Sequence, residues 1–214
     1  MKKTVFAAAM AAAFVFAAGV QAAPVTFKAD PTHTFVTYET IHKGMSTNRG
    51  RFDKTEATIT LDRAKKVGSV MVKIDPASVS TGVAALDEHL KGKDFFDVAA
   101  HPTVTFKGDK FTFDAKGRVK TVAGELSMLG KTQPVVLTAE RFACSTNPVS
   151  KLETCGGDFS TTIKRDQWGM ESALKYPGMS PDVRLLIQVE AAQEAAPAAA
   201  TEPSADHAHQ HHDH

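Results

Sequence analysis

The sequence predicts an all-β protein, an antiparallel sandwich or barrel. Apolar and polar residues alternate in short runs such as Thr58–Leu61, Val70–Ile74 and Val183–Val189, the pattern of half-buried strands. Turn-forming residues separate the runs, for example Asp75–Pro76 and Gly130–Lys131. The runs recur at short spacing without the alternation of strand and helix that is typical of βαβ units, which favours antiparallel pairing.

The first residues have the three-part pattern of a secretory signal peptide. Lys2 and Lys3 form a positive region, Val5–Ala18 is an uninterrupted apolar run, and Val20–Ala22 offers small residues for cleavage. The run is shorter than the roughly 20 residues that cross a bilayer. We therefore expect residues 1–22 to be removed and the product to be periplasmic, or secreted, without a stable membrane anchor.

The rest of the chain divides by composition. Without Lys2 and Lys3, the 25 Lys and Arg fall to 23 against 24 Asp and Glu, so no basic field for nucleic acid exists. Residues 23–191 are expected to form one folded domain, and residues 192–214 a disordered Ala/Pro linker with a His-rich tail. The tail is either a solvated extension or a weak ligand for a metal ion such as zinc.

One segment departs from the strand pattern. Val83–Lys91 is helix-like, with Leu86 and Leu90 four residues apart on one face. Thr81 is a candidate cap, and Phe95–Phe96 follow. A short helix with adjacent aromatic residues, inside a β-rich chain, is expected near the opening of a barrel.

The chain has two cysteines, Cys144 and Cys155, on either side of the loop-like stretch 145–154. In an oxidising compartment the simplest expectation is one structural disulfide. A redox-active pair is the alternative, but the spacing is not that of a CxxC motif.

Motifs for catalysis or metal binding are absent from the part predicted to fold. His33, His42, His89 and His101 follow neither HxH nor HExxH spacing, and no GxSxG is present. Hydrogen-bonded structural histidines are favoured over metal ligands. We expect no catalytic residues, no metal in the barrel and no cofactor.

Apolar residues are the main candidates for a functional site. Closed barrels of about eight strands either are packed solid or hold one small ligand, and Met and Phe line adaptable pockets well. Plain core packing is the alternative for each residue alone. The candidate cavity residues are Phe35, Tyr38, Ile41, Phe52, Ile59, Leu61, Met71, Leu86, Leu90, Phe95, Phe96, Phe106, Met128, Ile163, Trp168 and Leu186.

From Val25 to about Ala191 the chain resembles the YceI family of exported lipid-binding proteins. The order and spacing of several stretches carry the resemblance. They are His33–Tyr38, His42–Gly44, Gly50–Phe52, Asp87–Leu90, Lys93–Asp97, His101–Pro102 with Phe106, Gly124–Leu126, Gly130–Thr132, Pro134–Leu137, Asp166–Gly169 and Val183–Glu190.

The resemblance implies a lipocalin-like, eight-stranded antiparallel barrel with the short helix near one opening. It also implies noncatalytic binding, sequestration or transport of a polyisoprenoid or similar fatty amphiphile. Many relatives have an apolar residue in place of Lys43, which is a candidate for the ligand head group together with His42 and Arg165. The Cys144–Cys155 loop is found in only part of the family.

Two other functions stay open from the sequence. One is an enzyme acting on a lipid or quinone head group through His33, His42 or Arg165–Asp166. The other is a stress-response scaffold whose solid barrel has no cavity. A monomer and a homodimer are both compatible with the sequence.

Overall fold

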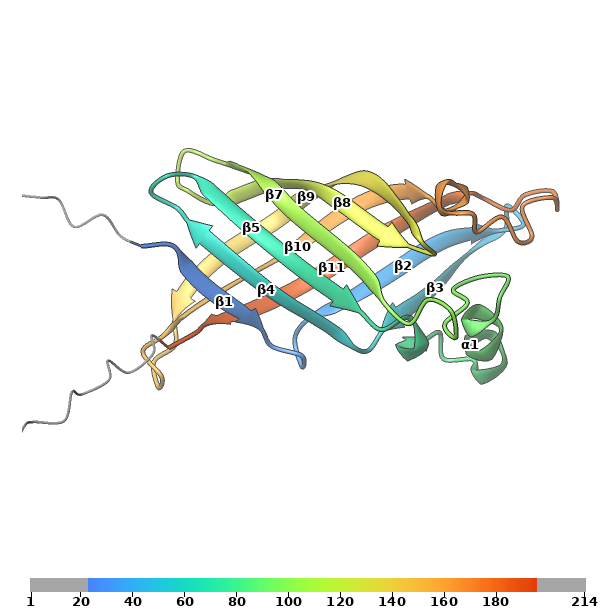
Figure 1. Cartoon of the computed structure of the whole chain (residues 1–214), viewed down its shortest axis with the longest axis horizontal. Helices are drawn as coiled ribbons and strands as arrows, with labels where there is room; N and C mark the ends of the chain where they lie inside the picture. The colour runs from blue at the N-terminus through green and yellow to red at the C-terminus, as the bar shows by residue number, and fades with distance from the viewer. Residues whose placement is uncertain (1–22, 196–214) are drawn as a thin grey trace, which may run out of the picture.

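The computed structural model describes residues 23–195 and forms an 8-stranded closed antiparallel β-barrel with one short α-helix (Figure 1). The predicted signal peptide and most of the predicted tail lie outside the described residues. The strands are β1 Val25–Ala29, β2 Phe35–His42, β3 Ser46–Phe52, β4 Thr55–Asp62, β5 Val67–Ile74, β6 Val79–Ser80, β7 Val104–Phe113, β8 Val119–Met128, β9 Lys131–Thr146, β10 Glu153–Lys164 and β11 Asp182–Gln193. The helices are α1 Ala84–Lys91 and the 3₁₀ turns η1 Pro76–Ser78 and η2 Arg165–Trp168.

The barrel closes between β11 and its first long strand, which is interrupted between β1 and β2. β11 pairs with β10 along one edge. Its other edge pairs with β1 through Phe27 and Gln193, and with β2 through Val36 and Ile187. β1 pairs with β4, and β2 pairs with β3, so β1–β2 and β3–β4 are two long strands, each interrupted once. Closure pairs the edges that an open sheet would expose.

Strand alternation sends one face of each strand into the barrel. Along β2, Val36 and Tyr38 are buried. Tyr38 lies opposite Gly50 of β3, and a side chain at Gly50 would clash with the tyrosine ring. The glycine therefore makes room for a large aromatic ring on the inner wall.

The two ends of the barrel differ in construction. α1, the β2–β3 turn and the segment from η2 to β11 gather at one end (Figure 1). β1 begins and β11 ends at the opposite end, beside the β9–β10 hairpin (Figure 1). Within the described residues, no helix has the length and apolar character needed to cross a membrane.

The structure corrects three local expectations. The cap of α1 is Val83, not Thr81; Thr81 instead donates its backbone N–H and its hydroxyl to Asp87 Oδ1, at 2.8 and 2.6 Å. The loop between the cysteines is shorter than the expected stretch 145–154, since β9 continues to Thr146 and β10 starts at Glu153, which leaves residues 147–152 as the turn. β11 extends to Gln193, two residues past the expected domain boundary at Ala191.

Candidate functional site

The larger of two cavities in the barrel lies at the α1 end and has a volume of about 290 Å³. Strand side chains form its wall, and α1, the Phe95–Phe96 pair and the segment 170–179 cover it. The lining residues are Val36, Tyr38, Thr40, His42, Asn48, Phe52, Ile74, Leu86, His89, Leu90, Phe95, Phe96, Val104, Leu126, Met128, Ile163, Arg165, Met170, Ala173, Met179, Val183 and Leu185.

The smaller cavity has a volume of about 90 Å³ and is almost wholly apolar. It is lined from the half of the barrel that contains β1 and the Cys144–Cys155 disulfide. The lining residues are Phe27, Thr34, Thr55, Ala57, Ile59, Leu61, Val70, Val72, Phe106, Phe111, Val119, Val122, Leu137, Phe142, Cys155, Gly156, Phe159, Ile187, Val189 and Ala191.

The two cavities follow one another along the barrel axis. On β7, Val104 lines the larger cavity and Phe106 the smaller one; on β11, Leu185 and Ile187 divide in the same way. Residues two apart on a strand point to the same face. The two spaces therefore lie at successive layers of inward side chains, with Phe106 in the layer that lines the smaller cavity.

Arg165 is the buried cation at the wall of the larger cavity, with 6% of its surface exposed. Its guanidinium donates to the backbone carbonyls of Met170 at 2.9 Å, Ser172 at 2.8 Å and Ser180 at 3.4 Å. Burial lowers the pKa of Arg165, because desolvation disfavours the charged form. Arg165 thus holds the irregular segment that follows η2 against the barrel.

Aromatic rings form the wall beside α1. Phe52 packs edge-on against Phe96, with ring centroids 5.3 Å apart, and Phe95 packs against His89 at 4.9 Å. Tyr38 lies 6.3 Å from Phe52. Burial, with a smaller contribution from the Asp87 carboxylate, raises the pKa of Tyr38 to about 12. The phenol therefore stays neutral and can donate a hydrogen bond at physiological pH.

The structure places most of the candidate cavity residues on the cavity walls. Their role in binding a ligand stays a prediction. Those on the larger cavity are Tyr38, Phe52, Leu86, Leu90, Phe95, Phe96, Met128 and Ile163, together with His42 and Arg165 of the candidate head-group set. Those on the smaller cavity are Ile59, Leu61 and Phe106.

Four candidates are corrected because they alternate with lining residues and therefore face outward. Phe35 precedes Val36 and carries the Arg51 guanidinium 4.2 Å above its ring. Ile41 is 43% exposed. Met71 lies between two lining valines, and Leu186 lies between two lining residues of β11.

Two further candidates lie elsewhere. Trp168 is 1% exposed and donates its indole N–H to the Leu126 carbonyl at 3.1 Å, but it lines neither cavity. It belongs to the packing between η2 and the barrel. Lys43 is exposed at the β2–β3 turn with a φ of 53°, so it is not on the cavity wall.

Sequence reasoning missed lining residues for two different reasons. On β11 the alternating apolar set is visible in the sequence and consists of Val183, Leu185, Ile187 and Val189. The sequence-based choice, Leu186, lies on the opposite face of the strand. Met170, Ala173 and Met179 come from an irregular segment with no apolar period, so alternation gives no signal for them.

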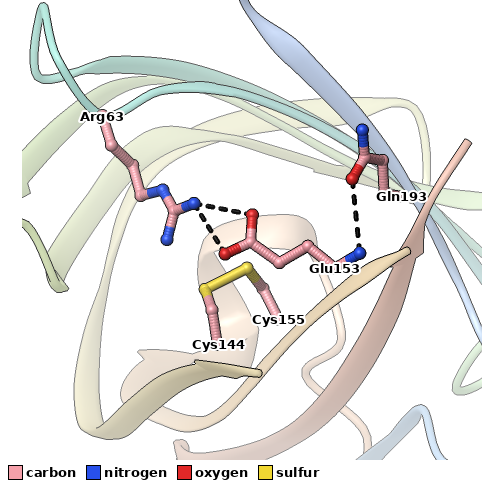
Figure 2. The surroundings of a disulfide bond; sticks show 5 residues. All are labelled: Arg63, Cys144, Glu153, Cys155 and Gln193. Carbon is pink, nitrogen blue, oxygen red and sulfur yellow. Dashed lines mark hydrogen bonds and ion pairs between the residues drawn. A yellow bond between two sulfur atoms is a disulfide. The ribbon is translucent and has the colours of Figure 1, made fainter. Parts of the chain in front are cut away.

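The end opposite α1 carries the predicted disulfide, which the structure confirms (Figure 2). Cys144 and Cys155 are directly paired residues of β9 and β10. Beside them, Glu153 accepts two hydrogen bonds from Arg63 at 2.6 and 2.7 Å, and its backbone N–H donates to the side chain of Gln193 (Figure 2). Because the carboxylate is paired and the sulfurs are bonded to each other, this cluster is a cross-link rather than a ligand set.

Comparisons with known proteins agree with the barrel. The model of the YceI-like domain matches residues 27–191, so the chain belongs to the YceI family. A UPF0312 protein of Azotobacter vinelandii is 32% identical over 197 residues, which cover 89% of this chain and 97% of that protein.

Two solved structures are similar to the fold. A mutant YceI protein of Campylobacter jejuni with a monobromobimane guest is 28% identical, with a TM-score of 0.62, and the match covers 72% of this chain and 90% of that one. A polyisoprenoid binding domain from Saccharophagus degradans is 14% identical, with a TM-score of 0.58, and the match covers 79% and 99%.

Proposed function

We propose that this chain binds a polyisoprenoid or similar long amphiphile inside its barrel, without catalysis, and sequesters or carries it. The observation that carries the proposal is the pair of adjacent cavities, about 290 and 90 Å³ in volume, with mainly apolar walls. A solid scaffold would have neither. Burying a methylene group is worth about 0.8 kcal/mol, so a long chain binds with few polar contacts.

The polar groups favour binding over catalysis. His33 is not on the cavity wall; its side chain is 56% exposed and contacts Asp30 at 3.0 Å. The hydrogen bonds that the Arg165 guanidinium donates within the described part of the chain go to backbone carbonyls. A neighbour of the same fold, 14% identical, is a polyisoprenoid binding domain, so a barrel of this fold can accommodate such a lipid.

A matched pair of variants tests the proposal. Leu185 lines the larger cavity, and Leu186 is its outward neighbour on the same strand. We expect Leu185→Trp to obstruct uptake of a polyprenol and Leu186→Trp to leave it unchanged. Native mass spectrometry of protein purified without detergent, before and after addition of the polyprenol, measures uptake and also the oligomeric state.

Equal uptake by both variants would contradict binding in this cavity. A wild-type protein that carries no lipid and takes up no polyprenol would overturn the proposed function. Circular dichroism of each variant verifies that the barrel has folded.

The setting of this activity is also part of the proposal. The signal-peptide pattern of residues 1–22 supports export to the periplasm, where a free polyprenoid needs a soluble carrier. N-terminal sequencing of the protein from a periplasmic extract should begin at Ala23; a chain that begins at Met1 in the cytoplasm would contradict export.

Zinc titration of the protein with and without residues 207–214 tests the tail as a weak metal ligand.

A further inference from the structure

Basic residues, but no acidic ones of the described chain, line the larger cavity. Arg165, His42 and His89 line it, as does Tyr38, whereas no Asp or Glu of the described chain does. The smaller cavity has no ionisable side chain among its described lining residues, since Cys155 is in the disulfide. The interior therefore has one basic end and one apolar end.

Arg165 stands out because its charge has no counter-ion among the ion pairs of the described residues. Its hydrogen bonds go to the neutral carbonyls of Met170, Ser172 and Ser180. A guanidinium has more N–H donors than three carbonyls occupy. Burying a cation without an opposite charge is costly, and an anion bound in the cavity would offset that cost.

The geometry points to an orientation and a head-group class for the ligand: we propose that the amphiphile binds with an anionic head, a phosphate or a carboxylate, at Arg165. Its tail then extends past Phe106 toward the smaller cavity. This inference rests on the proposed function. Arg suits such a head because its planar fork donates two parallel hydrogen bonds to carboxylate or phosphate oxygens.

The wall around Arg165 adds further hydrogen-bond donors. The Asn48 amide and the imidazoles of His42 and His89 line the same cavity. Each of them can donate a hydrogen bond to an oxyanion. An ammonium head would meet the guanidinium instead of a carboxylate, so a cationic amphiphile is the class that this cavity disfavours.

The test compares ligands that share a tail and differ in the head. Geranylgeranyl phosphate is compared with geranylgeraniol, and oleate with oleyl alcohol and oleylamine, by displacement of a fluorescent lipid probe from the delipidated full chain. A charge-assisted hydrogen bond is worth enough that we expect each anion to bind about ten-fold or more tightly than its alcohol. The phosphate and carboxylate arms tell which anion is preferred.

A matched variant assigns the preference to Arg165. Arg165→Gln should bring the ratio of anion to alcohol affinity close to one, whereas Lys164→Gln should leave the ratio unchanged. Lys164 loses the same charge one residue away, but its side chain is 56% exposed and paired with Asp182 at 2.7 Å. A general loss of packing would weaken acid and alcohol equally and would not change the ratio.

The possible results separate this inference from the proposed function. Alcohol and anion bound equally tightly by the wild type would overturn the anionic head and leave lipid binding intact. No binding of either would overturn the proposed function itself. A ratio unchanged in Arg165→Gln would overturn the role of Arg165. If that variant does not fold, Arg165→Lys replaces it; the loss of the planar fork should lower the ratio several-fold, and an unchanged ratio overturns the assignment.

Discussion

Filling the smaller cavity should shorten the lipid tail that the barrel accepts. Ala57 of β4 is 7% exposed and lines this cavity, so Ala57→Leu directs an isopropyl group into it. An empty apolar cavity costs about 24 cal/mol per Å³. A volume of about 90 Å³ then corresponds to about 2 kcal/mol, which a ligand tail regains when it occupies the space.

This free energy sets the expected effect on binding. Since a factor of ten in affinity is about 1.4 kcal/mol, Ala57→Leu should weaken binding of a long prenol such as solanesol by about 30-fold. A short prenol such as geraniol fits the larger cavity and should bind as before. The ligand-free variant should be as stable as the wild type, or more stable by up to about 2 kcal/mol.

The assay is displacement of a fluorescent lipid probe by each prenol, combined with urea denaturation of the delipidated protein. Thr58→Leu is the control, since Thr58 is the exposed, outward neighbour on the same strand. Equal losses for the long and the short prenol, or no loss for either, would refute the entry of the tail into the smaller cavity.

Three further predictions concern stability and ionisation. Replacing Cys144 and Cys155 together by Ala should lower the free energy of unfolding by roughly 3 kcal/mol, because an 11-residue separation is no longer closed in the unfolded chain; an unchanged urea midpoint would argue against a stabilising cross-link. Trp168→Phe should lower the free energy of unfolding by about 2 kcal/mol, since the Leu126 carbonyl loses its indole donor. Unfolding of this variant must be followed by circular dichroism, because the replaced residue is the one Trp of the chain. A stability equal to that of the wild type would show that this hydrogen bond is dispensable. Burial raises the pKa of Tyr38 to about 12, so an ultraviolet titration should show a tyrosine with that midpoint, absent in Tyr38→Phe. The free energy of unfolding should then fall between pH values of about 10 and 12, because the unfolded phenol, with a pKa of about 10, loses its proton first; no difference between wild type and Tyr38→Phe would refute the shift.

The strands were predictable because burial on one face imposes a period of two on the sequence. The runs 58–61, 70–74 and 183–189 all lie in strands. The face itself is harder to predict, since a shift of one residue exchanges all inward and outward side chains. At Leu185 and Leu186 both residues are apolar, so the sequence cannot say which one faces the cavity; the pairing of β11 with β2 decides it.

The cover of the larger cavity was only partly predictable, because it comes from two kinds of segment. α1 has a helical period, and its Leu86 and Leu90 line the cavity as expected. The segment from Met170 to Met179 has no period, and it is held by the hydrogen bonds of Arg165 to its carbonyls. Such contacts depend on tertiary geometry, so the sequence alone predicts only a loop and an isolated arginine here.

The unequal ends of the barrel lead us to expect that the ligand enters and leaves at the α1 end. At the far end β1, β10 and β11 are joined by strand pairing, and Cys144–Cys155 is a covalent link. Opening that end would break the backbone hydrogen bonds that pair these strands, whereas moving α1 or residues 170–179 breaks few backbone hydrogen bonds to the barrel. Amide hydrogen exchange should therefore be faster in α1 and residues 170–179 than in β10, and bound polyprenol should slow exchange mainly in those two segments. Protection that rises instead at the β9–β10 hairpin would place the entrance at the disulfide end.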